Sequence, residues 1–298
     1  MLTNPVFLTV QVLNSLALGM NLFIVAAGLT LIFGVLRVIN FAHGAFYMFG
    51  AYVLFTMIGQ FGATNLVFWL AVVAAALVLA VIGFIIERFL LSRLYDKEHL
   101  LQLLFTFAIV LILGDIAKMI WGSEQHSVSY PPMFSGAVDL GIVQYPVYLI
   151  FLMALGPIIA ISMWLIIEKT RWGRIIRAAT MDREMLSALG ANVKVIYSLV
   201  FVSGAALAGL GGALAAPRLA VEPGMDTSVI IECFIIVIIG GLGSLWGSFL
   251  GAIILGLVTM LGSAILPEFE MALTYAMMVV VLLWRPWGLL GKPETDRH

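Results

Sequence analysis

The side chains best suited to hydrogen-bond a polar solute lie between two long apolar segments. Arg37 to Gly44 reads R-V-I-N-F-A-H-G. The amide of Asn40 and the imidazole of His43 each carry donor and acceptor groups. Gly34 and Gly44 flank these residues, which predicts an interrupted helix whose free backbone groups line protein or a water-filled cavity. The alternative is an ordinary turn between two membrane spans, with Arg37 among the lipid headgroups.

A second set of amides follows one side of the first apolar segment. Gln11, Asn14 and Asn21 fall on one face of a helix, and Gly28 continues that stripe. Polar amides are costly in lipid, so we expect this face to point into a helix bundle or a wet cavity, where Asn14 and Asn21 would meet a solute. Hydrogen bonding between helices, without any solute contact, is the alternative.

A third group of residues predicts a docking element. The segment Arg174–Leu189 is expected to form a helix that ends at a Gly190 cap, and Asp182 interrupts its basic charge. This helix is too short and too charged to span a membrane. Its apolar face comprises Ala178, Met181, Met185, Ala188 and Leu189. Such a face lies on the membrane surface or inserts into a groove of a soluble partner, and the small alanines favour the partner.

The composition places most of the chain in lipid. The sequence is 63% hydrophobic and 10% charged, whereas soluble domains carry about 25% charged residues. The net charge of -1 gives no reason to expect nucleic acid as a partner. The chain lacks the patterns G-x-x-x-x-G-K-[ST], G-x-S-x-G and H-E-x-x-H, and its four histidines and one cysteine have no metal-ligand spacing. We therefore expect no enzyme activity, no metal and no cofactor bound by this chain.

About nine membrane spans are predicted, in a single domain covering 1–298. They lie near Val6–Val35, Ala45–Ile58, Leu66–Leu90, Leu100–Trp121, Val143–Ile167, Val195–Ala216, Val229–Ile239, Gly247–Leu266 and Met271–Trp284. Lysines and arginines gather in 88–97, 169–194 and 285–297, and the loop 122–142 has none. By the positive-inside rule the basic groups are cytoplasmic and that loop is outside, with the N-terminus out and the C-terminus in.

Glycines interrupt an apolar run in the second half of the chain as well. Gly243, Gly247 and Gly251 are spaced four apart, which lets helices approach closely. Paired interruptions in the two halves of a membrane protein indicate a transport path. Tight helix packing alone is the alternative.

Several of these stretches resemble one family. The segment G-L-T-L-I-F-G-V-L-R-V-I-N-F-A-H-G-A-F-Y-M-F-G-A-Y, Gly28 to Tyr52, is similar to the N-terminal hallmark of LivH-type permeases. G-R-I-I-R-A-A-T-M-D-R-E-M-L-S-A-L-G, Gly173 to Gly190, resembles the cytoplasmic coupling loop of that family, and the ending R-P-W-G-L-L-G also matches. LivH-type permeases are membrane subunits of ABC importers for branched-chain amino acids.

The resemblance implies an all-α polytopic bundle in a bacterial inner membrane. It implies a second related permease subunit, two cytoplasmic ABC ATPases that hold ATP, and a periplasmic solute-binding protein. The coupling residues would be Arg174, Ala178, Ala179, Asp182, Leu189 and Gly190. The residues of the solute pathway would be Asn14, Asn21, Asn40, His43 and Gly44.

Two other classes of transporter compete with an ATP-driven importer. An ion-driven secondary transporter needs an ion site within the membrane, and the ionisable residues available for it are Asp115, Lys118 and Glu232. Asp115 and Lys118 are three apart, so we expect them to pair with each other. A passive channel for a small polar solute such as urea or an amide is the other alternative.

Overall fold

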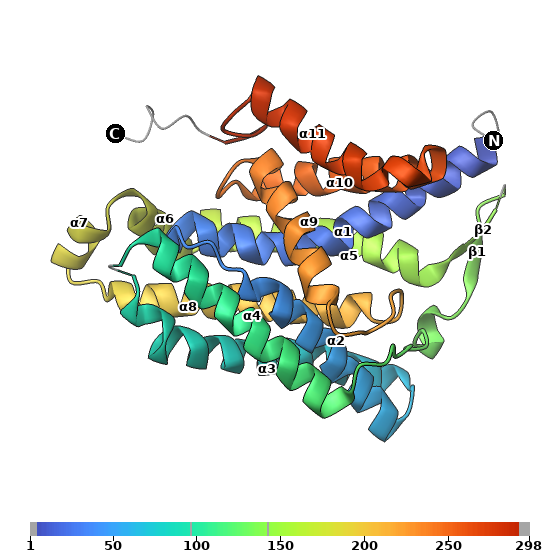
Figure 1. The fold of residues 1–298 in the computed structure, drawn as a ribbon, viewed down its shortest axis with the longest axis horizontal. Helices are drawn as coiled ribbons and strands as arrows, with labels where there is room; N and C mark the ends of the chain where they lie inside the picture. Colours follow the sequence, from blue (N-terminus) through green and yellow to red (C-terminus); the bar gives the residue numbers. More distant parts are fainter. Residues whose placement is uncertain (1–4, 96, 142, 292–298) are drawn as a thin grey trace.

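The computed structural model describes residues 5–95, 97–141 and 143–291. These residues form a bundle of α-helices (Figure 1), which confirms the all-α prediction. The helices are α1 (Pro5–Leu36), α2 (Ala42–Phe61), α3 (Asn65–Phe89), α4 (His99–Trp121), α5 (Val147–Lys169), α6 (Arg171–Met181), α7 (Arg183–Ala188), α8 (Val193–Ala215), α9 (Met225–Gly240), α10 (Leu245–Ile265) and α11 (Glu270–Trp284). Of two short antiparallel strands, β1 (Ala137–Asp139) lies in the predicted outer loop, and β2 (Gln144–Pro146) takes up the start of the predicted span Val143–Ile167.

Side-chain caps fix where several helices begin. The hydroxyls of Thr64, Thr170 and Ser244 each accept a hydrogen bond from the backbone N–H three residues later, at the starts of α3, α6 and α10. The amide oxygen of Asn192 does the same for α8. Each cap satisfies one of the four N–H groups that a helix start leaves without an intrahelical partner.

Among the residues that the structure describes, eight helices are long and apolar enough to cross a membrane, which is one fewer than predicted. The predicted span Val229–Ile239 lies in α9, which has 16 residues and is therefore about 24 Å long. That length falls short of a hydrocarbon core of about 30 Å. In Figure 1, α9 crosses the long axis of the bundle steeply instead of running alongside the other helices.

The bundle has two chemically different ends. One end, here called the basic end, carries α6, α7 and the turn between α3 and α4 (Figure 1, left). The opposite end, here called the hairpin end, carries β1, β2 and the start of α1 (Figure 1, right). Within the outer loop, His126 forms an isolated β-bridge with Val221, which precedes α9. This bridge places the start of α9 at the hairpin end.

The inner helices α1, α2 and α8 pack backbone against backbone. A Cβ built at Gly28 in α1 would lie 2.7 Å from the Gly204 carbonyl oxygen of α8. A Cβ built at Gly50 in α2 would lie 2.1 Å from the Gly209 carbonyl oxygen. Small residues permit such close approach, which is the usual way for helices to associate in lipid.

The glycine-marked breaks of the two halves meet at the basic end. Gly34, near the end of α1, lies against Gly243, so that a Cβ on Gly34 would be 3.1 Å from the Gly243 Cα. Gly243 has a φ of +82° in the turn between α9 and α10, a conformation that glycine adopts without strain. Gly247 packs against Gly240, and Gly251 packs against the Ile236 carbonyl. The predicted tight packing is therefore present.

Candidate functional site

The stretch around Asn40 is a connection between two antiparallel helices. α1 ends at Leu36, and α2 begins at Ala42 and runs back toward the hairpin end (Figure 1). Of the two interpretations of this stretch, the turn between spans is the observed one, and the interrupted single helix is wrong here. The turn is not an ordinary exposed one, because Val38 and Asn40 are buried.

This connection, residues 37–41, is held from two sides. The Arg37 guanidinium donates to the Thr180 carbonyl of α6 over 3.5 Å. The Thr106 hydroxyl of α4 donates to the Ile39 carbonyl over 3.2 Å. Arg37 has a φ of +55°, and a non-glycine residue in this region carries strain of about 1–3 kcal/mol. The connection is therefore a strained segment that links α6 to the start of α2.

Three buried polar side chains lie just before α2 and in its first two turns, and we call them the polar ladder: Asn40, His43 and Tyr47. Each has no exposed surface. Within the described chain, both amide atoms of Asn40, the His43 Nδ1 and the Tyr47 hydroxyl have no hydrogen-bond partner. An unsatisfied buried polar group costs about 1–3 kcal/mol. A fold that keeps several of them together is expected to use them for a ligand or a moving part.

The tautomer of His43 follows from its one hydrogen bond. Its Nε2 lies 2.8 Å from the Val25 carbonyl oxygen of α1. A carbonyl oxygen only accepts, so Nε2 carries the proton and donates. In the neutral ring this leaves Nδ1 as a bare acceptor inside the bundle. His43 thus ties α2 to α1 and presents an acceptor to the interior.

The other predicted pathway residues are placed differently. Asn21 is buried, and its side-chain amide donates to the Gly211 carbonyl of α8 over 3.2 Å. This is the hydrogen bond between helices that the alternative interpretation predicted. The Oδ1 atom of Asn21 has no hydrogen-bond partner in the described chain. Gly44 lies against the Asp226 carbonyl of α9, where a Cβ would be 2.3 Å away. Asn14 lies at the hairpin end and accepts from the Tyr145 hydroxyl of β2 over 3.0 Å. Asn14 is therefore separated from the polar ladder.

The predicted docking helix is two helices. α6 ends at Met181, and Asp182 adopts an extended conformation and caps α7 by accepting from the N–H groups of Glu184 and Met185. A single helix over Arg174–Leu189 is therefore wrong. The predicted cap at Gly190 is confirmed, since its φ is +87° and its N–H donates to the Ser187 carbonyl over 3.0 Å.

The apolar side chains of α6 and α7 are exposed at the basic end. Met181, Met185 and Leu189 are 85%, 64% and 79% exposed, and Ala178 is also exposed. Ala179 is 5% exposed and faces the bundle, so it is not available to a partner in this conformation. We call the exposed set the elbow face: Ala178, Met181, Met185, Ala188 and Leu189. Exposed apolar clusters of this kind mark interaction surfaces.

One buried network was missed from the sequence. Glu87 of α3 is 1% exposed and accepts from the Tyr95 hydroxyl over 2.7 Å and from the Ser198 hydroxyl of α8. Burial raises the pKa of Tyr95, and its hydrogen bond to Glu87 raises it further, so this hydroxyl remains a donor at neutral pH. The signal in the sequence is a lone acid inside the predicted span Leu66–Leu90.

Removing the carboxylate of Glu87 is expected to destabilise the basic end. Glu87→Leu leaves the hydroxyls of Tyr95 and Ser198 without an acceptor, at a cost of about 3 kcal/mol in the free energy of unfolding. Glu87→Gln keeps one acceptor oxygen and is expected to lose less than half of that. Thermal unfolding of the purified variants measures the difference, and equal losses for the two would contradict the network.

The charged pair in α4 does not form an internal ion site. Lys118 Nζ lies 3.7 Å from Asp115 Oδ1, which confirms the predicted pairing, and both side chains are more than half exposed. They therefore face the surroundings of the bundle and not its interior. Among the residues that the structure describes, no three histidine, cysteine or acidic side chains come together as a metal site.

Comparison with known proteins decides the family. A model of the branched-chain amino acid transport system permease component matches residues 11–282. The chain belongs to this family. As a family member it is a multi-pass membrane protein of the kind that forms transport permeases, which agrees with its eight candidate spans. No solved structure matches it.

Several relatives cover nearly the full chain. The permease protein BraD of the high-affinity branched-chain amino acid transport system of Pseudomonas aeruginosa is 29% identical, over 96% of this chain and 97% of its own. LivH of the corresponding Escherichia coli system is also 29% identical, with 96% of each chain covered. LivM of E. coli, a second permease protein, is 27% identical over 92% of this chain and 68% of its own.

Proposed function

We propose that this chain is one membrane-spanning subunit of an ATP-driven importer for branched-chain amino acids. It binds no nucleotide itself, and ATP is held by two cytoplasmic ATPases on partner chains. The observation that carries the proposal is the elbow face, an exposed apolar surface on a charged helix pair at the basic end. The printed names of BraD and LivH support the solute class.

We place the basic end in the cytoplasm, with the N-terminus outside and the C-terminus inside. Lysines and arginines of 88–97 and 169–194 gather at this end, and such residues are enriched in cytoplasmic loops. The loop 122–142 has no lysine or arginine, and β1 of the hairpin end lies within it. A periplasmic solute-binding protein would then dock at the hairpin end.

The connection 37–41 is the proposed route from the ATPases to the solute. A rigid shift of α6 changes the Arg37 contact with Thr180 and pulls on a segment that is already strained. Asn40 lies on the same segment, and His43 follows it on α2. Movement of α6 therefore exposes or covers the polar ladder, which supplies hydrogen-bonding groups for the zwitterionic end of an amino acid. Small shifts at a docking site are amplified in this way when packed elements have two arrangements.

Substitution of Asn40 distinguishes a role in solute contact from a role in stabilising the fold. Asn40→Leu keeps about the same volume and removes a buried amide that has no partner in the described chain. We expect the free energy of unfolding to stay the same or rise, because a desolvation penalty is removed. Uptake of the solute is expected to fall by about tenfold, which corresponds to one lost hydrogen bond to a charged group.

The matched control for this variant is Thr30→Val. Thr30 of α1 hydrogen-bonds Ser248 of α10 over 2.6 Å and, at two residues from Gly28, lies on the other side of α1 from His43. This change is expected to lower stability by about 1 kcal/mol and to leave uptake per folded molecule unchanged. If Asn40→Leu lowers stability and leaves uptake per folded molecule at the wild-type level, Asn40 is structural and the proposed path is wrong.

Co-purification tests the assembly. The tagged chain is expressed with the ATPases and the second permease of its own transport system and purified in mild detergent. We expect all partners to be recovered, including a permease related to LivM, and uptake to stop when ATP is depleted. Recovery of the chain alone, or uptake that follows an ion gradient after ATP depletion, would favour the secondary transporter. Conduction without ATP or a binding protein would favour the channel.

A further inference from the structure

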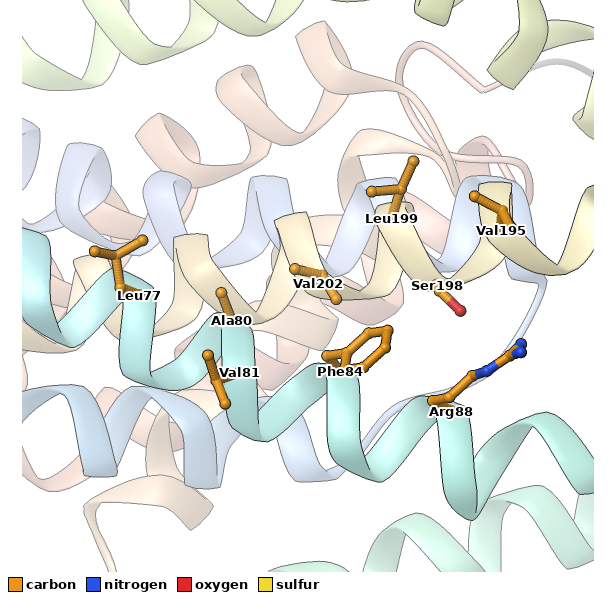
Figure 2. Close-up of a pocket in the computed structure, with 9 residues that line it drawn as sticks. All are labelled: Leu77, Ala80, Val81, Phe84, Arg88, Val195, Ser198, Leu199 and Val202. Carbon is orange, nitrogen blue, oxygen red and sulfur yellow. The ribbon is translucent and has the colours of Figure 1, made fainter.

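A groove runs along the bundle surface between α3 and α8 (Figure 2). Its volume is about 680 Å³, within the range of about 300–1,000 Å³ that is usual for ligand pockets. Its lining is apolar except at one end and on the floor, and consists of Leu77, Ala80, Val81, Phe84, Arg88, Val195, Ser198, Leu199 and Val202.

The groove has bulky walls and a smaller floor. Leu77, Val81 and Phe84 stand along the α3 side and are 62%, 58% and 45% exposed. Leu199 stands on the α8 side and is 44% exposed, whereas Ser198 is 7% exposed. The Ser198 hydroxyl is already bound to Glu87. The floor therefore offers contact area and no free donor, which suits a hydrocarbon chain.

One cation closes the groove at the basic end. Figure 2 shows the Arg88 side chain at this end, directed away from Phe84 and toward the end of the groove where Val195 lies. The ion pairs Asp115–Lys118 and Glu168–Arg177 do not involve it, and no carboxylate among the described residues neutralises Arg88. An apolar groove that ends in a guanidinium without a described carboxylate partner complements a molecule with a hydrocarbon tail and an anionic headgroup.

The length of the groove matches one leaflet of a bilayer. Leu77 and Arg88 are eleven residues apart in α3, which corresponds to about 16 Å along the helix. Half of a hydrocarbon core of about 30 Å is about 15 Å. A tail that reaches the depth of Leu77 therefore starts from a headgroup at the level of Arg88.

We propose that this groove binds one anionic phospholipid, with an acyl chain between α3 and α8 and its phosphate on Arg88. A helix from a second protein fits the groove less well, because helix contacts in lipid favour small residues over walls such as Leu77 and Phe84. Free phosphate shares the head chemistry but lacks the tail that the groove accommodates. The inference is independent of the solute and of the ATPases.

Lipid retention tests this proposal. The full-length chain is placed in nanodiscs with equal amounts of phosphatidylglycerol and phosphatidylcholine, released, and examined by native mass spectrometry for bound lipid. We expect phosphatidylglycerol to be retained about fivefold over phosphatidylcholine. Arg88→Gln should abolish that preference, and Val81→Trp, which fills the groove, should reduce retention of both lipids. Arg93→Gln is the control, since Arg93 is a cation at the same end but outside the lining.

Three results would overturn the proposal. One is an equal loss of preference in Arg88→Gln and Arg93→Gln, which would indicate general attraction to the basic end. A second is release of the retained lipid by inorganic phosphate alone. A third is a disulfide from Phe84→Cys to a co-purified second permease, which would show a protein in the groove. Retention that is insensitive to phosphate and specific to Arg88 and Val81 supports it.

Discussion

Met185→Glu is expected to lower recovery of the ATPases with this chain by about 30-fold or more. Met185 lies in the middle of the elbow face and is 64% exposed, so the substitution leaves the fold of the isolated chain intact. A carboxylate at the centre of an apolar contact loses the contact and must be desolvated without a partner. Losses of about 2 kcal/mol or more in binding free energy are typical of such central positions. Solute uptake should fall together with ATPase binding.

Ser187→Glu is the matched control for Met185→Glu. Ser187 is exposed on α7, but at two residues from Met185 it lies on the other side of the helix. Ser187→Glu introduces the same negative charge into the same short helix as Met185→Glu. Recovery of the ATPases with Ser187→Glu should stay within about twofold of wild type, as expected for a surface substitution outside the contact. Equal losses in the two variants would mean that charge near α7, and not the elbow face, controls association.

Of the substitutions proposed for α1 to α8, Gly50→Ala is expected to lower the free energy of unfolding the most. The added Cβ would lie 2.1 Å from the Gly209 carbonyl oxygen and 2.6 Å from the Gly209 Cα, and both are backbone atoms that no rotamer change can move. α2 and α8 must separate to admit it, which disrupts the packing around Tyr47. We expect a loss above about 3 kcal/mol, seen as little monodisperse protein after size-exclusion chromatography and a large drop in melting temperature.

Gly59→Ala is the matched control in the same helix. Gly59 lies near the end of α2, and a Cβ there meets no atom within 4 Å. Alanine is the better helix former, so the variant should be as stable as wild type or more stable by about 0.5–1 kcal/mol. If both glycine variants unfold at the same temperature, close approach of α2 and α8 is not what holds the inner helices together.

The helix content and the exposed elbow face could be predicted because each depends on local sequence. Continuous apolar runs specify the spans, and the spacing of Met181, Met185 and Leu189 predicted an apolar face, whose side chains are exposed in the structure although they belong to two helices and a cap. The split at Asp182 was less predictable, because the same carboxylate is tolerated inside a helix and favoured at a cap. The orientation of Ala179 toward the bundle depends on how α6 docks, which no local pattern encodes.

The buried site could not be derived from sequence because its contacts are distant in the chain. The polar stretch predicted that Asn40 and His43 face protein or a water-filled cavity, but not that α4 and α6 would contact the connection 37–41. The Glu87 carboxylate accepts a hydrogen bond from the hydroxyl of Ser198, which is 111 residues away in the sequence. α9 had the composition of a span but not the length, since its oblique path is set by packing against α2 and α10.

Thiol labelling from each side of the membrane tests the central claim most directly. The chain has one cysteine, Cys233, which is buried, so Met185→Cys in a Cys233→Ala background carries one reactive thiol. A membrane-impermeant maleimide is applied to right-side-out and inside-out vesicles, with and without the ATPases. We predict labelling at position 185 from the inside only, and protection from it when the ATPases are present. Labelling from the outside, or labelling from the inside that the ATPases do not reduce, would contradict the account.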